Sequence, residues 1–187
     1  MGIHRSFAEL LEYPSADLPR RLDRCVAAVG GPDHGAADDA AAAGALRRLH
    51  DEVGRLGLAR LEEAYTAAFD MDPGCTLYVG HHLFGETQHR SLFMSRLAAM
   101  YRDAGFAEGA AELPDYLPTM LRFVDRPGVT DASRSTLVDE AIAPAAAAIA
   151  EALERRGDPY ALALRALLGV LEAEVPPAAG NRERATT

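Results

Sequence analysis

Residues 116–125 of the chain read YLPTMLRFVD. At helical spacing, the apolar residues of this segment fall into two adjacent rows, and only Thr119, Arg122 and the following Arg126 form a polar stripe. A helix that is apolar around most of its circumference is buried on most sides. We therefore expect this helix to lie at the centre of a helical core.

Helical spacing of apolar residues also recurs before this segment. We expect a hairpin of two helices with its turn at residues 13–17, then a third helix that ends near Arg55 and a fourth over residues 58–69. The three glycines and the proline of residues 30–38 predict a surface loop between the second and third helices. The N-terminal half is thus predicted to be helical apart from its turns.

The segments after residue 125 continue the helical pattern. Asp131 is expected to cap a helix in which Pro144 marks either a kink or the first turn of a second half, and a last helix is expected over residues 159–171. Residues 175–187 lack a core-forming pattern and predict a disordered tail. Because no stretch shows the alternation typical of strands, we predict an all-α, single-domain fold over residues 1–174.

The charge of the chain limits its partners. Its 187 residues include 19 Lys and Arg against 28 Asp and Glu, so the formal net charge is −9. Nucleic acid requires a positive surface, so we expect no nucleic-acid partner, and a basic partner is more plausible. With 49% hydrophobic and 25% charged residues, the composition is that of a globular protein.

The cysteines and the apolar segments indicate a reduced, cytoplasmic protein. Cys25 and Cys75 lie fifty positions apart without a CxxC motif, which argues against a disulfide framework and a four-ligand zinc site. The longest strongly apolar segment, residues 141–150, is too short to cross a bilayer, and residues 1–14 do not have the pattern of a secretory leader. We expect no stable membrane insertion.

The densest polar cluster is HHLFGETQH, residues 81–89. On an unbroken helix, His82, Glu86 and His89 would share one face, and Glu86 to His89 is a Glu-x-x-His step of the kind used in di-iron bundles. No second such step exists in the chain, and Gly85 disfavours a continuous helix. A small helical metalloprotein built on His81–His89 remains an alternative to the simpler interpretation of a polar turn beside a loop.

A second constellation is ELPDYLP, residues 112–118. Its prolines keep the preceding residues extended, and Asp115 is placed to cap the central helix. The chain has no GxSxG motif, no glycine-rich phosphate loop and no cysteine beside a histidine. The sequence therefore suggests no catalytic residues and no enzyme.

Short motifs follow one another along nearly the whole chain. They are LLEYP at residues 10–14, YTAAFD at 65–70, HLFGE at 82–86, ELPDYLP at 112–118 and DPYA at 158–161. In this order they resemble the NarJ branch of the NarJ/TorD/DmsD family, whose members are dedicated chaperones of molybdenum enzymes. NarJ proteins serve respiratory nitrate reductase.

The resemblance implies a TorD-like helical bundle that acts as a cytoplasmic chaperone. It implies a partner, the apo catalytic subunit of a molybdoenzyme of the nitrate reductase type, bound through its N-terminal segment until molybdopterin guanine dinucleotide is inserted. That cofactor would be handled through the client, with none bound stably by the chain. Related chaperones serve other molybdoenzymes, and both a monomer and a domain-swapped dimer remain open. A plain helical scaffold is a third hypothesis.

The matching motifs also imply a client-binding site. Its candidate residues are Tyr65, Tyr78, His82, Leu83, Phe84, Glu86, Glu112, Pro114, Asp115, Tyr116 and Leu117. The carboxylates are expected to border the client groove and the apolar side chains to contact the client, with ordinary core packing as the alternative for each apolar residue. The family usually has histidine where Tyr116 stands and glycine where Ser91 stands. The tyrosine at position 116 puts in doubt any role that needs a titrating imidazole there. The serine at position 91 suggests that this turn, or the client, differs.

Overall fold

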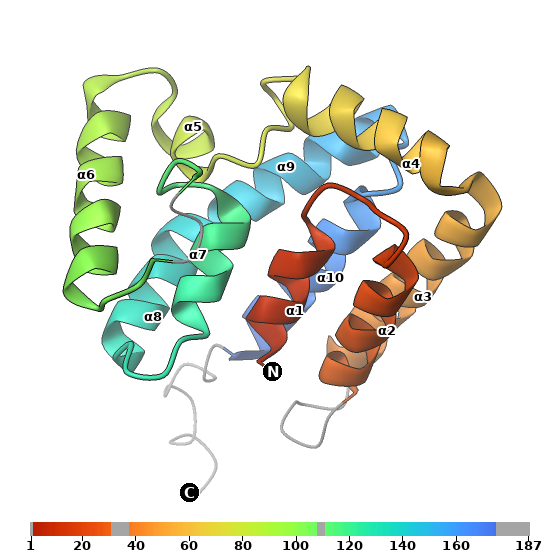
Figure 1. The fold of residues 1–187 in the computed structure, drawn as a ribbon, viewed down its shortest axis with the longest axis horizontal. Helices are drawn as coiled ribbons and strands as arrows, with labels where there is room; N and C mark the ends of the chain where they lie inside the picture. The colour runs from red at the N-terminus through yellow and green to blue at the C-terminus, as the bar shows by residue number, and fades with distance from the viewer. Residues whose placement is uncertain (1, 31–37, 108–110, 175–187) are drawn as a thin grey trace, which may run out of the picture.

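A computed structural model describes residues 2–30, 38–107 and 111–174 of the chain, which form helices joined by turns and loops (Figure 1). The elements are α1 Ile3–Leu10, α2 Leu18–Val29, α3 Asp38–Leu56, α4 Leu58–Tyr65, the π-helix η1 Thr66–Asp70, α5 Val79–Phe84, α6 Gln88–Asp103, α7 Leu117–Val124, α8 Asp131–Leu137, the π-helix η2 Val138–Ile142, α9 Ala143–Arg156 and α10 Ala161–Glu174. The predicted all-α fold is confirmed. Most of the loop predicted at residues 30–38, and the tail predicted at 175–187, lie outside the described residues.

The helices pack around α1, α7 and α10. In Figure 1, α1 and α7 lie side by side on the near face, and the two helices are in contact. Helix α10 packs against α1, α3 and α9, whereas α6 stands at the edge of the molecule and contacts α5. None of the helices in the described part of the chain is long and apolar enough to cross a membrane.

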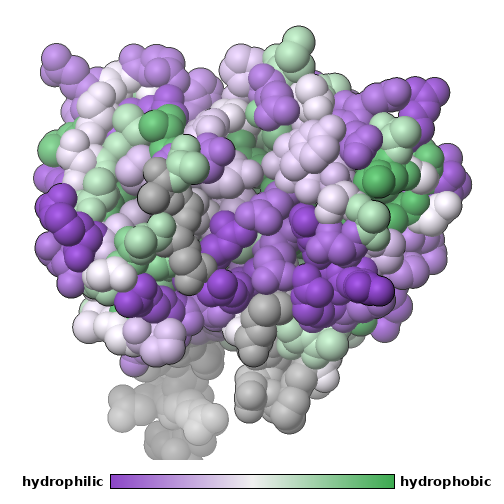
Figure 2. All heavy atoms as spheres, viewed as in Figure 1, coloured by the Kyte–Doolittle hydropathy of each residue, from purple (hydrophilic) through white to green (hydrophobic). Residues whose placement is uncertain are grey.

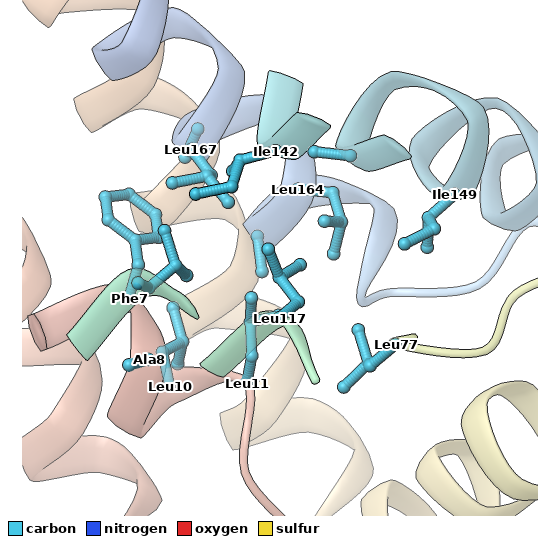
Figure 3. Packing of buried hydrophobic residues seen from close by; sticks show 14 of the residues in the cluster. Phe7, Ala8, Leu10, Leu11, Leu77, Leu117, Ile142, Ile149, Leu164 and Leu167 are labelled. Carbon is cyan, nitrogen blue, oxygen red and sulfur yellow. The ribbon is translucent and has the colours of Figure 1, made fainter. Parts of the chain in front are cut away.

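Helix α7 has the central position that its apolar pattern predicts. Every residue of α7 except Arg122 is buried. Figure 3 shows side chains from several helices meeting in one cluster, among them Phe7, Leu11, Leu117, Ile149 and Leu164. Since each large apolar side chain contributes roughly 1.5–3 kcal/mol when fully buried, this cluster is the main source of the stability of the fold.

Two local predictions in the C-terminal half have different outcomes. The cap of α8 is Thr130 rather than Asp131, because the backbone N–H of Ser133 donates to the Thr130 hydroxyl over 3.2 Å, while Asp131 is already the first helical residue. Pro144 lies in the first turn of α9, where its missing N–H breaks no hydrogen bond within that helix. The π-helix η2 joins α8 to α9 directly before it.

A buried histidine fastens the N-terminal helix to two other elements. The Nε2 atom of His4 in α1 lies 3.0 Å from a carboxylate oxygen of Glu174 at the end of α10, and its Nδ1 atom lies 3.6 Å from Asp125 at the end of α7. Burial by itself lowers the pKa of His4, but hydrogen bonds to both carboxylates and their charges outweigh that effect and raise the pKa to about 9. His4 is therefore a cation in the folded protein near neutral pH.

This contact of His4 with two carboxylates, which we call the His4 clasp, makes the free energy of unfolding depend on pH. Because the pKa of His4 is raised on folding from 6.5 to about 9, its contribution is fully present below pH 6.5 and is lost as the pH rises through 9. The shift corresponds to roughly 3 kcal/mol. We predict that His4→Gln lowers the free energy of unfolding by about this amount at pH 6 and by little at pH 10, measured by urea denaturation.

His50 provides a matched control. Its side chain is half exposed and lies 3.9 Å from Asp23, so His50→Gln is expected to leave the free energy of unfolding nearly unchanged at both pH values. An equal loss of stability in His4→Gln at pH 6 and pH 10 would contradict a charged clasp.

Candidate functional site

Two adjoining clefts lie between the N-terminal helices and α5–α7. The first, which we call the tyrosine cleft, encloses about 660 Å³ and is lined by Glu12, Tyr13, Tyr65, Asp70, Glu112, Tyr116, Thr119 and Arg122. The second, which we call the His81 cleft, encloses about 360 Å³, and its walls include residues 69–73 with Tyr78, His81, Glu86 and Arg90. Asp70 belongs to both walls. The face over α1 and α7, seen in Figure 2, is mainly hydrophilic across its middle.

Backbone pairing brings together the two chain segments that build these clefts. Tyr78 and Tyr116 form an isolated antiparallel bridge. The N–H of Val79 donates to the carbonyl of Asp115, and the N–H of Leu117 donates to the carbonyl of Leu77, both over 2.8 Å. Because Tyr78 precedes α5 and Tyr116 precedes α7, the bridge fixes the starts of both helices beside each other.

Asp115 lies beneath this bridge and does not cap α7, in contrast to the sequence prediction. Tyr116 occupies the capping position, and no side chain accepts a hydrogen bond there. The Asp115 side chain is fully buried, and the Nε–H of Arg90 donates to its Oδ2 over 3.1 Å. The bridge directs the carboxylate inward, and Gly80 leaves room for it, since a Cβ at Gly80 would lie 2.7 Å from Oδ2.

Arg90 links the buried Asp115 to the surface of the His81 cleft. Its NH1 group donates to Glu86, which is also bonded to Nδ1 of His81 over 3.1 Å. The hydrogen bond from His81 and the charge of Arg90 lower the pKa of Glu86, so it is an anion near neutral pH. The Arg90 guanidinium also lies over the ring of Tyr78, 5.8 Å from its centre.

Hydroxyl groups line the neighbouring tyrosine cleft. The Tyr65 hydroxyl donates to the carbonyl of Leu11 over 3.0 Å and lies 3.3 Å from the hydroxyl of Tyr116. The hydroxyl of Tyr78, a residue of the adjoining His81 cleft, donates over 3.0 Å to Glu112 on the wall of the tyrosine cleft. Burial is the largest of the effects that raise the pKa of all three tyrosines, and that of Tyr78 is about 12. All three hydroxyls are therefore neutral under physiological conditions.

The structure brings some of the predicted site residues to the clefts and leaves others away from them. Those on the walls are Tyr65, Tyr78, Glu86, Glu112 and Tyr116. Those not on these walls are His82, Leu83, Phe84, Pro114, Asp115 and Leu117. Leu117 is fully buried in the core, and the ring of Phe84, 38% exposed, packs against Phe93 instead. The His82 ring bonds to the carbonyl of Thr76 over 2.7 Å, and burial lowers its pKa.

The structure does not support the metal site considered for residues 81–89. Helix α5 ends at Phe84, Gly85 has a φ angle of +60°, and α6 begins at Gln88, so no continuous helix aligns His82, Glu86 and His89. Within residues 2–30, 38–107 and 111–174, no group of three or more His, Cys, Asp or Glu is arranged to hold a metal ion.

Five residues of the tyrosine cleft were not among the predicted site residues. They are Glu12, Tyr13, Asp70, Thr119 and Arg122. For Thr119 and Arg122 the sequence did contain a signal, because both belong to the polar stripe of residues 116–125. A polar side chain on an otherwise buried helix needs a hydrogen-bonding partner or a cavity. Glu12, Tyr13 and Asp70 belong to two of the matching motifs, the first two just after the end of α1 and Asp70 at the end of η1.

Comparison with known proteins identifies the family. A model of the family described as "Nitrate reductase delta subunit" matches residues 35–166, well over half of the chain. The chain belongs to the nitrate reductase delta subunit family. The match includes the HLFGE and ELPDYLP motifs and both segments of the backbone bridge, so the described clefts are built largely from the part that this family shares.

Two bacterial proteins illustrate the similarity of this family member to known relatives. The chain is 35% identical over 112 residues to the probable nitrate reductase molybdenum cofactor assembly chaperone NarJ of Bacillus subtilis, a match that covers 60% of this chain and 59% of that protein. It is 30% identical over 114 residues to the nitrate reductase-like protein NarX of Mycobacterium tuberculosis, covering 61% of this chain and 16% of that protein. The matched region thus spans less than two thirds of either relative.

The buried ion pair under the bridge can be tested by one isosteric substitution. We predict that Asp115→Asn lowers the free energy of unfolding by about 3 kcal/mol, because it leaves the largely buried Arg90 guanidinium without its inner counter-charge. Glu86→Gln removes the exposed partner of the same guanidinium and is expected to change stability little. Urea denaturation measures both. A loss near 1 kcal/mol for Asp115→Asn would instead match a simple helix cap.

Proposed function

We propose that this chain is a molybdenum cofactor assembly chaperone for a nitrate reductase type of molybdoenzyme. The observation that carries the proposal is the membership of the chain in the nitrate reductase delta subunit family, together with its 35% sequence identity over 112 residues to a probable NarJ assembly chaperone. In this proposal the client is the apo catalytic subunit, and its N-terminal segment binds along the tyrosine and His81 clefts.

The charges of the two clefts favour such a client. Their walls carry the carboxylates of Glu12, Asp70, Asp72, Glu86 and Glu112 and the guanidinium groups of Arg90 and Arg122. The excess of carboxylates attracts an Arg-bearing segment and orients it.

Apolar surface beside these charges suits the other face of an amphipathic client helix. Met71 is 75% exposed and Tyr13 is 51% exposed at the edges of the clefts. Apolar and aromatic anchors next to charged rims are typical of surfaces that receive an amphipathic helix.

The proposal assigns the chain no catalytic activity of its own. It acts in the cytoplasm by holding the client open until molybdopterin guanine dinucleotide is inserted, so the cofactor is handled through the client and none is bound stably by the chaperone. The protein acts as a monomer or a dimer. Co-purification tests the assignment directly, since a tagged chain is expected to retain the apo catalytic subunit and to release it once the cofactor has been inserted.

Neutralising two carboxylates of the tyrosine cleft provides a quantitative test of client binding there. We predict that Asp70→Asn combined with Glu112→Gln weakens binding of a peptide from the client's N-terminus several-fold and flattens its salt dependence, because both carboxylates lie in the tyrosine cleft. Isothermal titration at two salt concentrations measures both effects.

The matched control removes the same charge elsewhere. Glu151 and Glu172 are exposed on α9 and α10, so Glu151→Gln with Glu172→Gln is expected to leave peptide binding nearly unchanged. Equal weakening by both pairs of substitutions would point to the net charge of the chain and contradict binding in the groove.

A further inference from the structure

We propose that the tyrosine cleft is a binding site, or seat, for a single guanidinium group. It would thus recognise one arginine side chain of the bound client segment. This inference rests on the proposed function, and it adds the chemistry of one subsite. It is carried by the cleft's uncompensated carboxylates, its hydroxyl groups and one orphaned buried side chain.

The first observation is an excess of negative charge that the protein itself leaves unpaired. The guanidinium of Arg122 pairs with Glu12 on one wall of the cleft. Asp70 and Glu112, on the other walls, have no cation partner among the described residues, and Glu112 accepts only the hydroxyl of Tyr78. A cation in the cleft would meet two carboxylates without competing with Arg122.

The second observation is the orphaned hydroxyl of Thr119. Only 2% of this residue is exposed, yet it lines the cleft, and its Oγ1 atom has no hydrogen-bond partner in the part of the chain that the structure describes. A buried hydroxyl without a partner costs stability, so a site that keeps one is suited to a ligand that supplies the missing hydrogen bond. Isosteric replacement by valine would remove that cost, which makes this hydroxyl separable from the fold.

The third observation is the direction of the tyrosine hydroxyls. Since Tyr65 gives its proton to the carbonyl of Leu11, the hydroxyl of Tyr116 donates to Tyr65. Its remaining lone pair is then available as an acceptor on the cleft wall. Tyr116, Thr119, Asp70 and Glu112 thus offer acceptors to one cleft from three different parts of the chain, η1, the segment before α7, and α7 itself.

This donor and acceptor balance distinguishes arginine from other side chains. A guanidinium carries five N–H donors in one plane and no acceptor, so it can address several separated acceptors at once. An ammonium group is a compact point charge that cannot span them, and a neutral amide leaves both carboxylates uncompensated. The cleft therefore favours arginine over lysine and over the neutral isostere citrulline.

The experiment uses the full chain and three small probes. N-acetylarginine amide, N-acetyllysine amide and N-acetylcitrulline amide are titrated into isotopically labelled protein, and shifts of the backbone amide resonances of Tyr116 and of residues 119–122 report binding in the cleft. We expect the arginine probe to bind, the lysine probe to bind several-fold more weakly, and the citrulline probe to bind at least about tenfold more weakly.

Thr119→Val tests the orphaned hydroxyl. We expect it to weaken binding of the arginine probe by about tenfold while leaving the melting temperature unchanged or raised. Thr136→Val, at an exposed position of α8, is the matched control and should change neither quantity. Unchanged probe affinity in Thr119→Val, or equal binding of the arginine and citrulline probes, would overturn the arginine seat.

These outcomes are separable from those of the proposed function. If the catalytic subunit co-purifies but the arginine probe does not bind, the seat is wrong and the chaperone assignment stands. If the probe binds with the expected preference but no molybdoenzyme subunit co-purifies, the seat stands and the client assignment is wrong.

Discussion

The clefts depend on the buried contact between Arg90 and Asp115 beneath the Tyr78–Tyr116 bridge. A carboxylate that is taken wholly out of water needs a counter-charge close by, and Arg90 provides one at 3.1 Å. The same guanidinium reaches Glu86 at the surface and lies over the ring of Tyr78. One ion pair thereby holds α6, the start of α5 and the segment before α7 in one arrangement. The walls of both clefts come from these parts, from α7 and from the N-terminal motifs beside them.

Local patterns were sufficient to predict the helices but not the contacts between their ends. The apolar rows of residues 116–125 correctly indicated a central helix, because the side chains that must be buried all lie on that segment. The cap of α8 was misassigned because Thr130 and Asp131 are neighbours that can both cap, and backbone geometry alone selects Thr130. The Tyr78–Tyr116 bridge joins residues far apart in sequence through main-chain groups, which leave no trace in side-chain periodicity.

The same distinction explains which site residues were predicted. The motifs indicate which chain segments build the two clefts. They do not distinguish side chains that line a cleft from side chains that are buried behind its wall. Glu112 and Asp115 stand three positions apart in one motif, yet the first lines the tyrosine cleft and the second is fully buried. Thr119 was missed for the opposite reason, because a lone threonine in an apolar helix carries no motif and becomes informative only when its hydroxyl is seen to lack a partner.

The tyrosine at position 116 keeps the wall of the tyrosine cleft free of an ionisable imidazole at that position. Histidine, usual at this position in the family that the motifs resemble, has an ordinary pKa of about 6.5 and would add positive charge to the cleft on mild acidification. Burial raises the pKa of Tyr116, with Glu112 and Glu12 adding to the shift, so its hydroxyl stays neutral. The carboxylates of the cleft then face no titrating cation at this position. A neutral hydroxyl in place of an imidazole therefore leaves the charge of the tyrosine cleft to its carboxylates and to Arg122.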